Sequence, residues 1–396
     1  MARTPTSRAN RRAKTVTLGK RERQFAALLW RRGGLARSEI HQITGVHPTL
    51  TGQSVALLIR AGLVRNGKPA SSAERGRPQT PVVIDPDRRK FLGISLSPGE
   101  VRVARLDPMG RPLGEEIVRR VGGQSRENGD LVTLAARSLK QAIDPAIFSI
   151  GITVTGVVDP AGQALLFSSA LPSASPVSLK PIYQAAGDIP VILDNDLHAL
   201  SMRWLMTSES PEGEVMLVGI DDGRLGASVL IDGRPQRGSV TAGNELGHTR
   251  LAVETDRCYC GQVGCLERIV SSRQLKHFGA KTERSLDEVL ADPGPDRQAL
   301  LRLLDLLVTG LGNAVNFMRP ARLVIASPLG RHTILQQYIQ DELPDRVLPG
   351  IRSRVRVSFW EQPYVQSAEN AAWLAISDVF GESPAVVERE GAGASR

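Results

Sequence analysis

Three cysteines and one histidine in the second half of the chain have the residue types and the spacing of a metal site. Cys258, Cys260 and Cys265 are the only cysteines among the 396 residues, and they fall within eight consecutive positions. His248 stands ten positions before the first of them. Zinc takes four soft or borderline ligands in a tetrahedron, and a structural site fills all four positions. The sequence therefore predicts a structural Zn²⁺ held by His248, Cys258, Cys260 and Cys265.

Two plainer readings of the cysteines remain open: ordinary buried thiols, or one disulfide and a spare thiol. Their clustering favours the metal, because scattered positions would be expected of core thiols. Two carboxylates flank the predicted metal loop, Glu245 one helical turn before His248 and Glu267 just after Cys265. Neither is needed to complete the zinc shell, so both are candidates for binding a ligand.

This stretch resembles the signature of the ROK family, which unites sugar-responsive repressors and sugar kinases. The resemblance rests on Glu245-Leu246-Gly247-His248 and on the Cys-x-Cys-Gly-x-x-Gly-Cys-x-Glu run from Cys258 to Glu267. It implies that the cysteines and the histidine hold zinc. It also implies that Glu245, His248 and Glu267 contact sugar hydroxyls, so that His248 links metal and ligand.

The net charge of +9 is unevenly distributed along the chain. Residues 1–90 contain 19 Lys and Arg and 5 Asp and Glu, a net charge of +14, and residues 91–396 carry the remaining 31 and 36, a net charge of −5. A basic block of this kind indicates a polyanionic partner, most often nucleic acid. A solvated basic tail without a partner is the alternative.

The first 86 residues predict a small helical unit. We expect a disordered basic tail over residues 1–20 and then three helices. The first begins near Arg21, the second has Ser38 as its N-cap and stops at Gly45, and the third begins at Pro48. Two short strands follow, the second ending near Ile84.

Three helices followed by a strand, a turn and a strand is the order of a winged helix-turn-helix, which we expect over residues 21–86. The third helix would enter the major groove of double-stranded operator DNA by its N-terminal half. The wing tip contains Gly76-Arg77-Pro78, similar to the wing of ROK repressors, and its arginines could lie in a narrow minor groove. A helical protein-interaction domain is the alternative. The candidate DNA-binding residues are His47, Thr49, Thr51, Gln53, Arg75 and Arg77.

The pattern after Pro86 alternates apolar strand-like runs with helical stretches, which predicts an α/β fold with mixed sheets. The resemblance implies a two-lobed, actin-like sugar-kinase fold, with the ligand between the lobes. We expect this ROK ligand-binding and oligomerisation domain over residues 87–381 and a flexible tail over 382–396. Helices up to about Met318 are expected either to form dimer contacts, as the family implies, or to pack in the core.

The turns that bind nucleotide in ROK kinases are altered in this chain. The first family turn, Asp-x-Gly-Gly-Thr, reads Ser95-Leu96-Ser97-Pro98-Gly99, and proline removes a backbone N–H. The Gly-Thr-Gly turn reads Asp222-Gly223-Arg224, where Asp222 should repel a triphosphate. A late glycine pair reads Ala326-Ser327. Phosphoryl transfer depends on this positioning, so the sequence argues against an enzyme.

Asn195-Asp196 matches the family's Asn-Asp pair, whose aspartate is the catalytic base in the kinases. Without ATP, the pair can still hydrogen-bond a sugar hydroxyl, because each hydroxyl both donates and accepts. A solvated turn is the alternative. The family often has a further asparagine that contacts sugar, and here the matching pair reads Ala170-Leu171. The ligand is then either an unusual or modified sugar, or not a sugar. The candidate ligand-binding residues are Asn195, Asp196, Glu245, His248 and Glu267, with Thr155 and Gly156 below them by analogy.

Together these features predict a DNA-binding transcriptional regulator, a repressor of carbohydrate metabolism, controlled by a sugar or sugar derivative. A ROK sugar kinase with an accessory DNA-binding domain is the alternative. We expect a cytoplasmic homodimer or homotetramer without a membrane segment, since no run of about 18 apolar residues is present. Clustered cysteines fit a reducing compartment.

Overall fold

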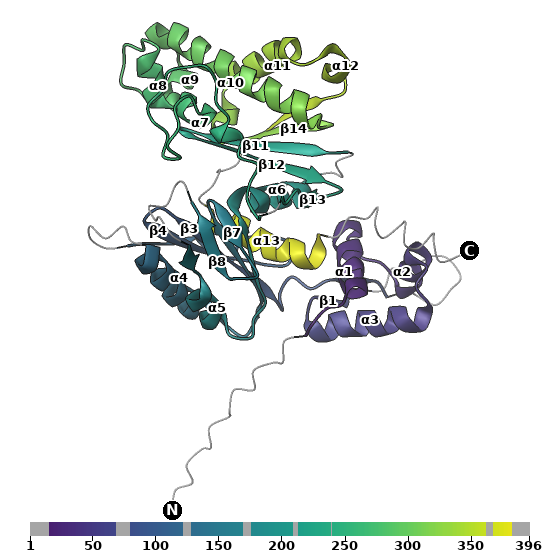
Figure 1. Ribbon diagram of the computed structural model, residues 1–396. Coiled ribbons are helices and arrows are strands. Elements are labelled where there is room, and N and C mark those ends of the chain that lie inside the picture. The colour runs from purple at the N-terminus through teal and green to yellow at the C-terminus, as the bar shows by residue number, and fades with distance from the viewer. Residues whose placement is uncertain are drawn as a thin grey trace, which may run out of the picture.

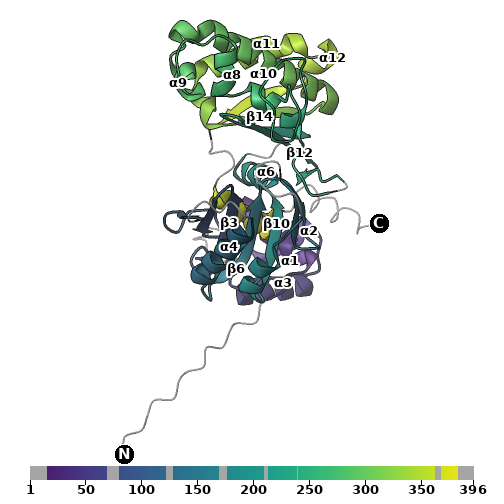
Figure 2. The ribbon, with the colours of Figure 1, turned by 60° about the vertical axis from the view of Figure 1, so that its left-hand side comes forward.

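The computed structural model describes residues 16–68, 80–121, 128–168, 176–208, 213–238, 240–361 and 367–381. Figures 1 and 2 show three bodies, which we call the helical unit (residues 16–86), the first lobe (87–195 with 367–381) and the second lobe (213–361). In the view of Figure 1 the helical unit lies beside the first lobe, and the second lobe stands above the first lobe. The fold is therefore the mixed α/β, two-lobed arrangement expected from the sequence, with an additional N-terminal helical unit.

The helical unit consists of α1 (Lys20–Arg32), α2 (Arg37–Thr44), α3 (Pro48–Ala61) and an antiparallel pair of strands, β1 (Val64–Asn66) and β2 (Val82–Ile84). Its centre is filled by fully buried side chains, among them Phe25, Leu29 and Leu58. The second helix begins earlier than Ser38, which was the expected N-cap. Ala36 takes that place, and its N–H donates to Glu39 Oε2 at 2.6 Å, so a glutamate in the first turn does the capping. The expected basic tail 1–15 and wing tip 69–79 lie outside the described residues.

The first lobe is built on a five-stranded sheet in the order β10-β6-β3-β4-β5, parallel among β10, β6 and β3 and antiparallel from β3 to β5. Its helices α4 and α5 lie on one face and α13 on the other (Figure 1). A Cβ at Gly151 would stand 1.7 Å from the Ala371 carbonyl oxygen, so α13 packs directly on the backbone of the sheet. The elements are β3 (Lys90–Ser97), β4 (Glu100–Leu106), β5 (Ile117–Arg120), α4 (Asn128–Ala142), β6 (Ile147–Val154), a small sheet of β7 (Val157–Asp159), β8 (Ala164–Phe167) and β9 (Val177–Ser178), then α5 (Lys180–Ala186), β10 (Val191–Asn195) and α13 (Ala368–Phe380).

The second lobe contains another five-stranded sheet, in the order β13-β12-β11-β14-β15. One helix, α10, forms the centre of its core, where Leu300, Leu304, Leu307 and Leu311 are each at most 1% exposed. The elements are β11 (Val215–Asp221), β12 (Arg224–Ile231), β13 (Arg234–Pro235), η1 (Leu246–His248), α7 (Leu266–Ile269), α8 (Ser272–His277), α9 (Leu286–Ala291), η2 (Gly294–Asp296), α10 (Arg297–Met318), β14 (Arg322–Ala326), η3 (Pro328–Arg331), α11 (Thr333–Arg346), α12 (Pro349–Arg352) and β15 (Arg356–Trp360).

Residues Gly294–Met318 form the one helical segment of the described chain that is long and apolar enough to cross a membrane, with a mean hydropathy of 1.3. Of its most apolar window, 56% is buried inside the protein. Its place at the centre of the second lobe explains the apolar composition, so the segment is weak support for a membrane span.

Helix α6 (Asp196–Thr207) joins the two lobes and lies between them, next to α13 (Figure 1). Its apolar side chains, including Leu200 and Trp204, pack with Leu217 and Val324 of the second-lobe sheet. Its N-terminus follows directly on β10 of the first lobe. Asp196, the first residue of α6, is therefore placed where the two lobes meet.

Candidate functional site

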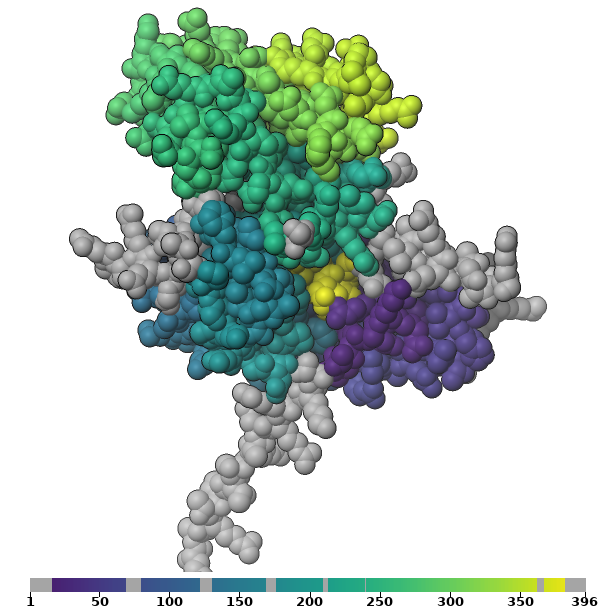
Figure 3. All heavy atoms as spheres, in the orientation of Figure 1, coloured from purple at the N-terminus to yellow at the C-terminus, as the bar shows by residue number. Residues whose placement is uncertain are grey.

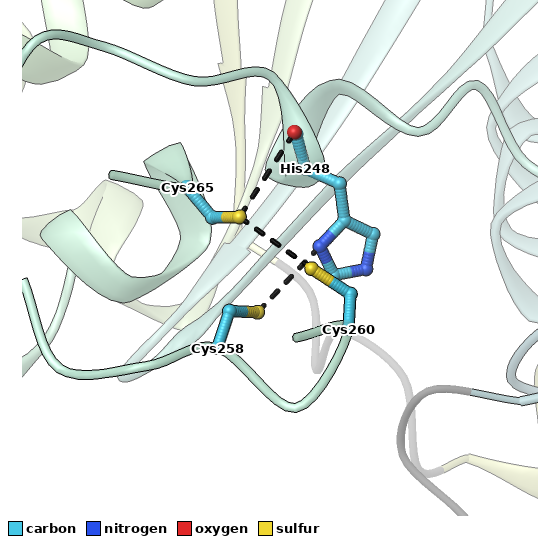
Figure 4. Close-up of side chains that lie close together, drawn as sticks. All are labelled: His248, Cys258, Cys260 and Cys265. Carbon is cyan, nitrogen blue, oxygen red and sulfur yellow. Dashed lines mark hydrogen bonds between the residues drawn. The ribbon is translucent and has the colours of Figure 1, made fainter. Parts of the chain in front are cut away.

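His248 and the three cysteines converge on one point of the second lobe (Figure 4). One ligand atom from each of the four residues lies within 4.8 Å of the others. The Cys260 and Cys265 sulfurs are 3.6 Å apart, and Cys258 Sγ is 3.7 Å from His248 Nδ1. A tetrahedral zinc with Zn–S bonds of about 2.3 Å separates its sulfurs by about 3.8 Å, whereas a disulfide requires about 2.05 Å. The cluster thus has the dimensions of a four-ligand metal site, and its three cysteines are free in this structure and not paired in a disulfide.

The protonation of three of these four residues bears on whether they can bind a cation. Burial, followed by the neighbouring thiols, raises the pKa of the Cys265 thiol to about 12. Burial likewise raises the pKa of Cys258 and lowers the pKa of His248. Neutral imidazole and thiolates are the forms that bind metal, and a divalent cation lowers the pKa of a thiol that it coordinates. A bound Zn²⁺ would offset the repulsion that three clustered thiolates create.

The loop that carries the cysteines is held by its own backbone. Cys258 N–H donates to the Gln262 carbonyl at 2.7 Å, and Leu251 N–H donates to the Gly264 carbonyl at 2.8 Å. Gly264 has φ of +85°, and a Cβ there would stand 2.5 Å from the Leu251 carbonyl oxygen. Glycine is required at this position because the chain must both turn left-handed and approach Leu251 closely.

The two flanking glutamates lie on either side of the His248 ring. Glu245 Oε2 is 3.8 Å from Nε2, and Glu267 Oε2 is 3.8 Å from Nδ1. Glu267 is 5% exposed, and its carboxylate accepts hydrogen bonds from Leu225 N–H and the Tyr259 hydroxyl. The Glu245 side chain is 55% exposed, which leaves it open to a ligand.

The first-lobe side of the site is formed by the end of β6 and the start of α6. The Thr155 hydroxyl donates to Asp196 Oδ2 at 2.5 Å, and Asn195 Nδ2 donates to the Gly156 carbonyl at 2.9 Å. Asn195 Oδ1 accepts Leu197 N–H at 2.9 Å and so caps α6. Much of the amide of Asn195 is thereby used inside the protein, and its role is largely to position Asp196.

Asp196 and the two glutamates are close enough to act on one another electrostatically. Burial raises the pKa of Asp196 to about 6. Burial, then the charges of Asp196 and Glu267, raises the pKa of Glu245 to about 7, although solvent at its half-exposed side chain screens this effect. All seven candidate ligand residues thus fall into one group that contains residues of both lobes. Carboxyl groups with such pKa values both donate and accept hydrogen bonds near neutral pH, as polyol hydroxyls require.

The candidate DNA-binding residues at the start of α3 differ in their exposure. His47, Thr49 and Gln53 are exposed, and His47 Nδ1 accepts Thr49 N–H at 3.4 Å, which is a long helix cap. Thr51 was expected to face DNA, and this is wrong. It is 1% exposed, and its hydroxyl donates to the Val46 carbonyl at 3.0 Å, because the first turn of α3 packs on the preceding loop. Arg75 and Arg77 lie outside the described residues.

A family model described as the ROK family matches residues 129–375, more than half of the chain. This protein belongs to the ROK family. Among its relatives, the xylose repressor of Caldicellulosiruptor bescii is 26% identical over 74% of this chain and 79% of its own length. The transcriptional repressor Mlc of Escherichia coli is 24% identical over 82% and 85%, and an N-acetyl-D-glucosamine kinase of Salmonella typhi is 28% identical over 58% and 81%.

Solved structures of the ROK family show the same fold. A ROK family transcriptional regulator, described as a homologue of Escherichia coli Mlc, has a TM-score of 0.75 at 20% identity and covers 93% of this chain and 99% of its own. A ROK glucokinase from Streptomyces griseus has a TM-score of 0.57 at 17% identity and covers 72% and 99%. The 7% that the regulator leaves uncovered is about 28 residues, fewer than the helical unit contains, so the shared fold extends into that unit.

In two of the three altered nucleotide turns of this ROK chain, backbone groups are paired within the protein. Pro98-Gly99 is a two-residue turn between β3 and β4, with Ser97 paired to Glu100. In the second turn, Gly223 N–H donates to the Val270 carbonyl at 2.8 Å and Asp222 N–H donates to Asp221 Oδ1 at 2.8 Å. These two amides are therefore not presented to a phosphate.

The Asp222 carboxylate, which was expected to repel a triphosphate, also has a structural role in this turn. It accepts Ser272 N–H at 2.7 Å and the Ser272 hydroxyl. Asp222 therefore fixes the start of α8. The turn is unsuited to a nucleotide because its amides are occupied.

Sequence reasoning missed a buried group beside the site, formed by Asp194, His198 and Arg237. Asp194 Oδ1 is 2.7 Å from His198 Nδ1, both side chains are 0% exposed, and Arg237 of the second lobe forms an ion pair with Asp194 Oδ2. The four-residue spacing of Asp194 and His198 was a visible signal at the start of a helix. Nothing in the sequence marked Arg237, because its partner comes from the other lobe.

Proposed function

We propose that this ROK protein is a DNA-binding transcriptional repressor whose operator binding is controlled by a carbohydrate or related ligand held between its lobes. The observation that carries the proposal is the extent of the likeness. The N-acetylglucosamine kinase matches 58% of the chain, whereas Mlc matches 82% and the regulator structure covers 93%. The added part is the helical unit, which a kinase reaction does not need. A role as an enzyme is disfavoured by the occupied amides of the nucleotide turn.

The helical unit is proposed as a winged helix-turn-helix. The order of its elements supports this, since α2 and α3 are joined at Gly45 and the β1–β2 pair follows. Exposed His47, Thr49 and Gln53 at the start of α3 are suited to base edges or phosphates in the major groove. The basic block of residues 1–90 supplies the charge that phosphate contacts require, and Arg75 and Arg77 are proposed for the minor groove.

The ligand is proposed to bind to Asp196, Glu245, His248 and Glu267, with Asn195, Thr155 and Gly156 shaping the first-lobe side. Carboxylate oxygens suit sugar hydroxyls because they accept directional hydrogen bonds from them. The proposed structural zinc, on His248 and the three cysteines, would hold Glu267 and the His248 ring in place. A ligand that contacts Asp196 on α6 and Glu267 on α7 would draw the two lobes together.

A homodimer or homotetramer is proposed to convert lobe movement into a change at DNA. In a symmetric dimer, two recognition helices must match two half-sites about one helical turn apart. Exposed Phe317 and Leu348 of the second lobe, 83% and 63% exposed, are apolar side chains suited to such an interface. Rotation of the second lobes relative to the first lobes would then change the spacing of the helical units.

The test begins by selecting a binding site from random duplexes and measuring its affinity by fluorescence anisotropy. The expected site is a palindrome, and its affinity should change when a sugar that produces a thermal shift is added. Gln53→Ala should weaken specific binding roughly 5- to 100-fold, as expected for loss of a base contact. Gln340→Ala, at an exposed position of α11, is the matched control and should leave affinity unchanged.

An ATP-turnover assay with the same sugars distinguishes the kinase alternative. Sugar-dependent phosphorylation would establish an enzyme and contradict the argument from the occupied amides. Failure to select any DNA site would remove the regulator proposal itself.

A further inference from the structure

A segment of the second lobe reaches the first lobe immediately before Glu245. We call this segment, residues 236–238 and 240–244, the strap. Both of its ends are bonded to β12 of the second lobe. The first residue of the strap donates its N–H to the Val229 carbonyl at 2.7 Å, and the backbone of Asn244 exchanges two hydrogen bonds with β12. The strap is therefore part of the second lobe and continues directly into the residues proposed to bind the ligand.

Between its two ends, the strap is bonded to the first lobe. The Val158 N–H of β7 donates to the Thr241 carbonyl of the strap at 2.8 Å, which is a backbone hydrogen bond from one lobe to the other. The Arg237 guanidinium of the strap forms an ion pair with the Asp194 carboxylate, at the end of β10. One main-chain contact and one charged contact thus hold the strap on the first lobe.

Asp194 is arranged as a fixed anion for this contact. Its side chain and that of His198 are both 0% exposed, and His198 Nδ1 is 2.7 Å from Asp194 Oδ1, which leaves Oδ2 for Arg237. Burial alone would raise the pKa of Asp194, but the hydrogen bond with His198 and then the charges of His198 and Arg237 lower it below its usual value. His198 Nε2 has no hydrogen-bond partner among the described residues, so the polar contact of this buried ring is with Asp194.

Separation of the lobes at the strap would leave the Asp194 charge buried and without its cation. The removal of one partner from a buried ion pair is costly, because the remaining charge has lost its partner and has not regained water. The Arg237 side chain, in contrast, is 48% exposed, so it can be hydrated when it leaves. The pair therefore resists separation of the lobes but can break and re-form.

We propose that the ion pair of Arg237 with Asp194 is a latch that holds the strap on the first lobe and thereby positions Glu245 and His248 for the ligand. Arg237 is then a positioning residue, which acts on the ligand through the strap. The inference rests on the proposed ligand site between the lobes and describes how that site is kept assembled. When the latch is broken, fewer molecules have an assembled site, and the apparent affinity for the ligand falls in proportion.

Hydrogen exchange at the Val158 amide tests the latch without a ligand, because this amide donates to the strap. In the full-length, metal-loaded protein, Arg237→Gln should accelerate exchange at Val158 roughly tenfold. Exchange at Ile150, whose N–H donates to the Pro190 carbonyl within the first lobe, should change less than about threefold. Arg237→Lys keeps the positive charge and should retain most of the protection. Arg234→Gln, at an exposed position of the same segment, is the matched control and should alter neither amide.

Titration calorimetry then connects the latch to the ligand site, with glucose, xylose and N-acetylglucosamine as probes. Arg237→Gln should weaken the sugar that binds best roughly 5- to 10-fold, and Asp194→Asn should weaken it by a similar factor. Since both substitutions break the same latch, the double variant should lose no more affinity than the weaker-binding single variant. Losses that multiply in the double variant would show that Arg237 acts on the sugar independently of Asp194 and would reject the latch.

The exchange measurements are decisive even if Asp194→Asn does not fold, because they need only substitutions at the half-exposed Arg237. Unchanged exchange at Val158 in Arg237→Gln would overturn the proposal. Equal acceleration at Val158 and Ile150 would show that the ion pair only stabilises the fold, and would also reject it. Faster exchange at Val158 with unaltered sugar affinity would reject the positioning role. If none of the three sugars binds to the wild-type protein, this result counts against the carbohydrate site, whereas exchange at Val158 still decides whether the latch holds the strap.

Discussion

The first lobe has two neighbours, and its boundaries with them differ in kind. Toward the helical unit, one continuous apolar cluster contains Phe25 and Leu29 of α1 together with Phe91 of β3 and Phe380 of α13. Toward the second lobe, the apolar packing is divided, because most of the apolar residues of α6, such as Trp204, cluster with the second-lobe sheet. Figure 3 shows α13, in yellow, between the helical unit and the rest of the molecule.

Polar contacts are present at both boundaries. Trp30 Nε1 donates to the Pro108 carbonyl at 2.9 Å, and its ring meets Trp373 edge-on at 6.3 Å, which locks α1 to the first lobe. Between α6 and α13, Arg203 is 3.2 Å from Glu369 and donates to Asn370 at 3.0 Å. Buried apolar surface resists separation at about 25 cal/mol per Å², whereas polar pairs can exchange partners with water at small net cost.

This difference indicates where the molecule can bend. The helical unit and first lobe share a core, so a ligand is expected to move them as one body. The movement is expected between α6 and α13, where the two lobes meet. Asp196 stands at the start of α6, so a ligand bound to Asp196 and Glu267 acts directly on that boundary.

The largest effect is expected from Trp373→Ala. Trp373 is 4% exposed and packs against Trp30 and Gly110, so its truncation should lower the free energy of unfolding by about 4 kcal/mol, measured by chemical denaturation. Because the lost contact joins α13 to α1, hydrogen exchange in α1 should accelerate in this variant.

Trp204→Ala is the matched control, since Trp204 is 5% exposed and packs toward the second lobe. It should destabilise the protein by a similar amount without accelerating exchange in α1. Equal acceleration of α1 in both variants would mean that the two boundaries do not differ as described.

The elements on each side of these boundaries were largely predictable from sequence, but the boundaries were not. Helices α6 and α13 have local signals in the sequence, because each begins after a residue whose side chain caps it, Asn195 for α6 and Ser367 for α13. Apolar periodicity in a sequence indicates that a helix has buried faces, but it does not indicate which elements cover those faces. The contacts between α6 and α13 join residues that are far apart in the chain. Arg203 of α6 and its partner Asn370 of α13, for example, are separated by 167 positions.

The candidate site shows the same limit. The cysteine spacing predicted the ligand cluster because those residues are close in sequence. Local pattern reasoning placed Thr51 on the DNA-facing side of α3, although the preceding loop covers it. It also missed Tyr259, whose hydroxyl bonds Glu267, and Arg237, whose partner Asp194 is 43 residues away. Exposure and pairing across lobes are set by tertiary packing, which a single sequence does not display.

Metal removal should lower the stability of the second lobe and leave the boundary between the helical unit and the first lobe intact. If zinc binds the four ligands, an excess of free metal of about 100 times Kd stabilises the protein by about 2.7 kcal/mol, and chelation removes this contribution. Cys260→Ser should lose the metal, measured by elemental analysis, and weaken sugar binding, while exchange in α1 stays slow.

Tyr259→Phe is the control for the metal prediction. It keeps the aromatic ring beside His248, 5.6 Å between ring centroids, and removes the hydroxyl that bonds Glu267. It should retain one metal per chain. Full metal content in Cys260→Ser would show that the site is not the closed four-ligand cluster.

The smallest effect is expected from the pH dependence of the boundary at Asp196. Burial raises the pKa of Asp196 from 3.8 to about 6, so the folded protein prefers the protonated carboxyl. Its contribution to stability is complete below about pH 4 and is lost as the pH rises through about 6; at about 1.4 kcal/mol per pKa unit, the loss is roughly 2 to 3 kcal/mol. Asp196→Asn should remove that part of the pH dependence and narrow the difference in unfolding free energy between pH 4 and pH 8. Asp341→Asn, at an exposed site on α11, should leave the profile unchanged.

A bound sugar should have a similar effect on the wild-type protein. A ligand hydroxyl that donates a hydrogen bond to Asp196 stabilises the ionised carboxylate, so saturation with sugar should flatten the dependence of the unfolding free energy on pH. If sugar instead steepens this dependence, the sugar does not bind at the boundary between the lobes.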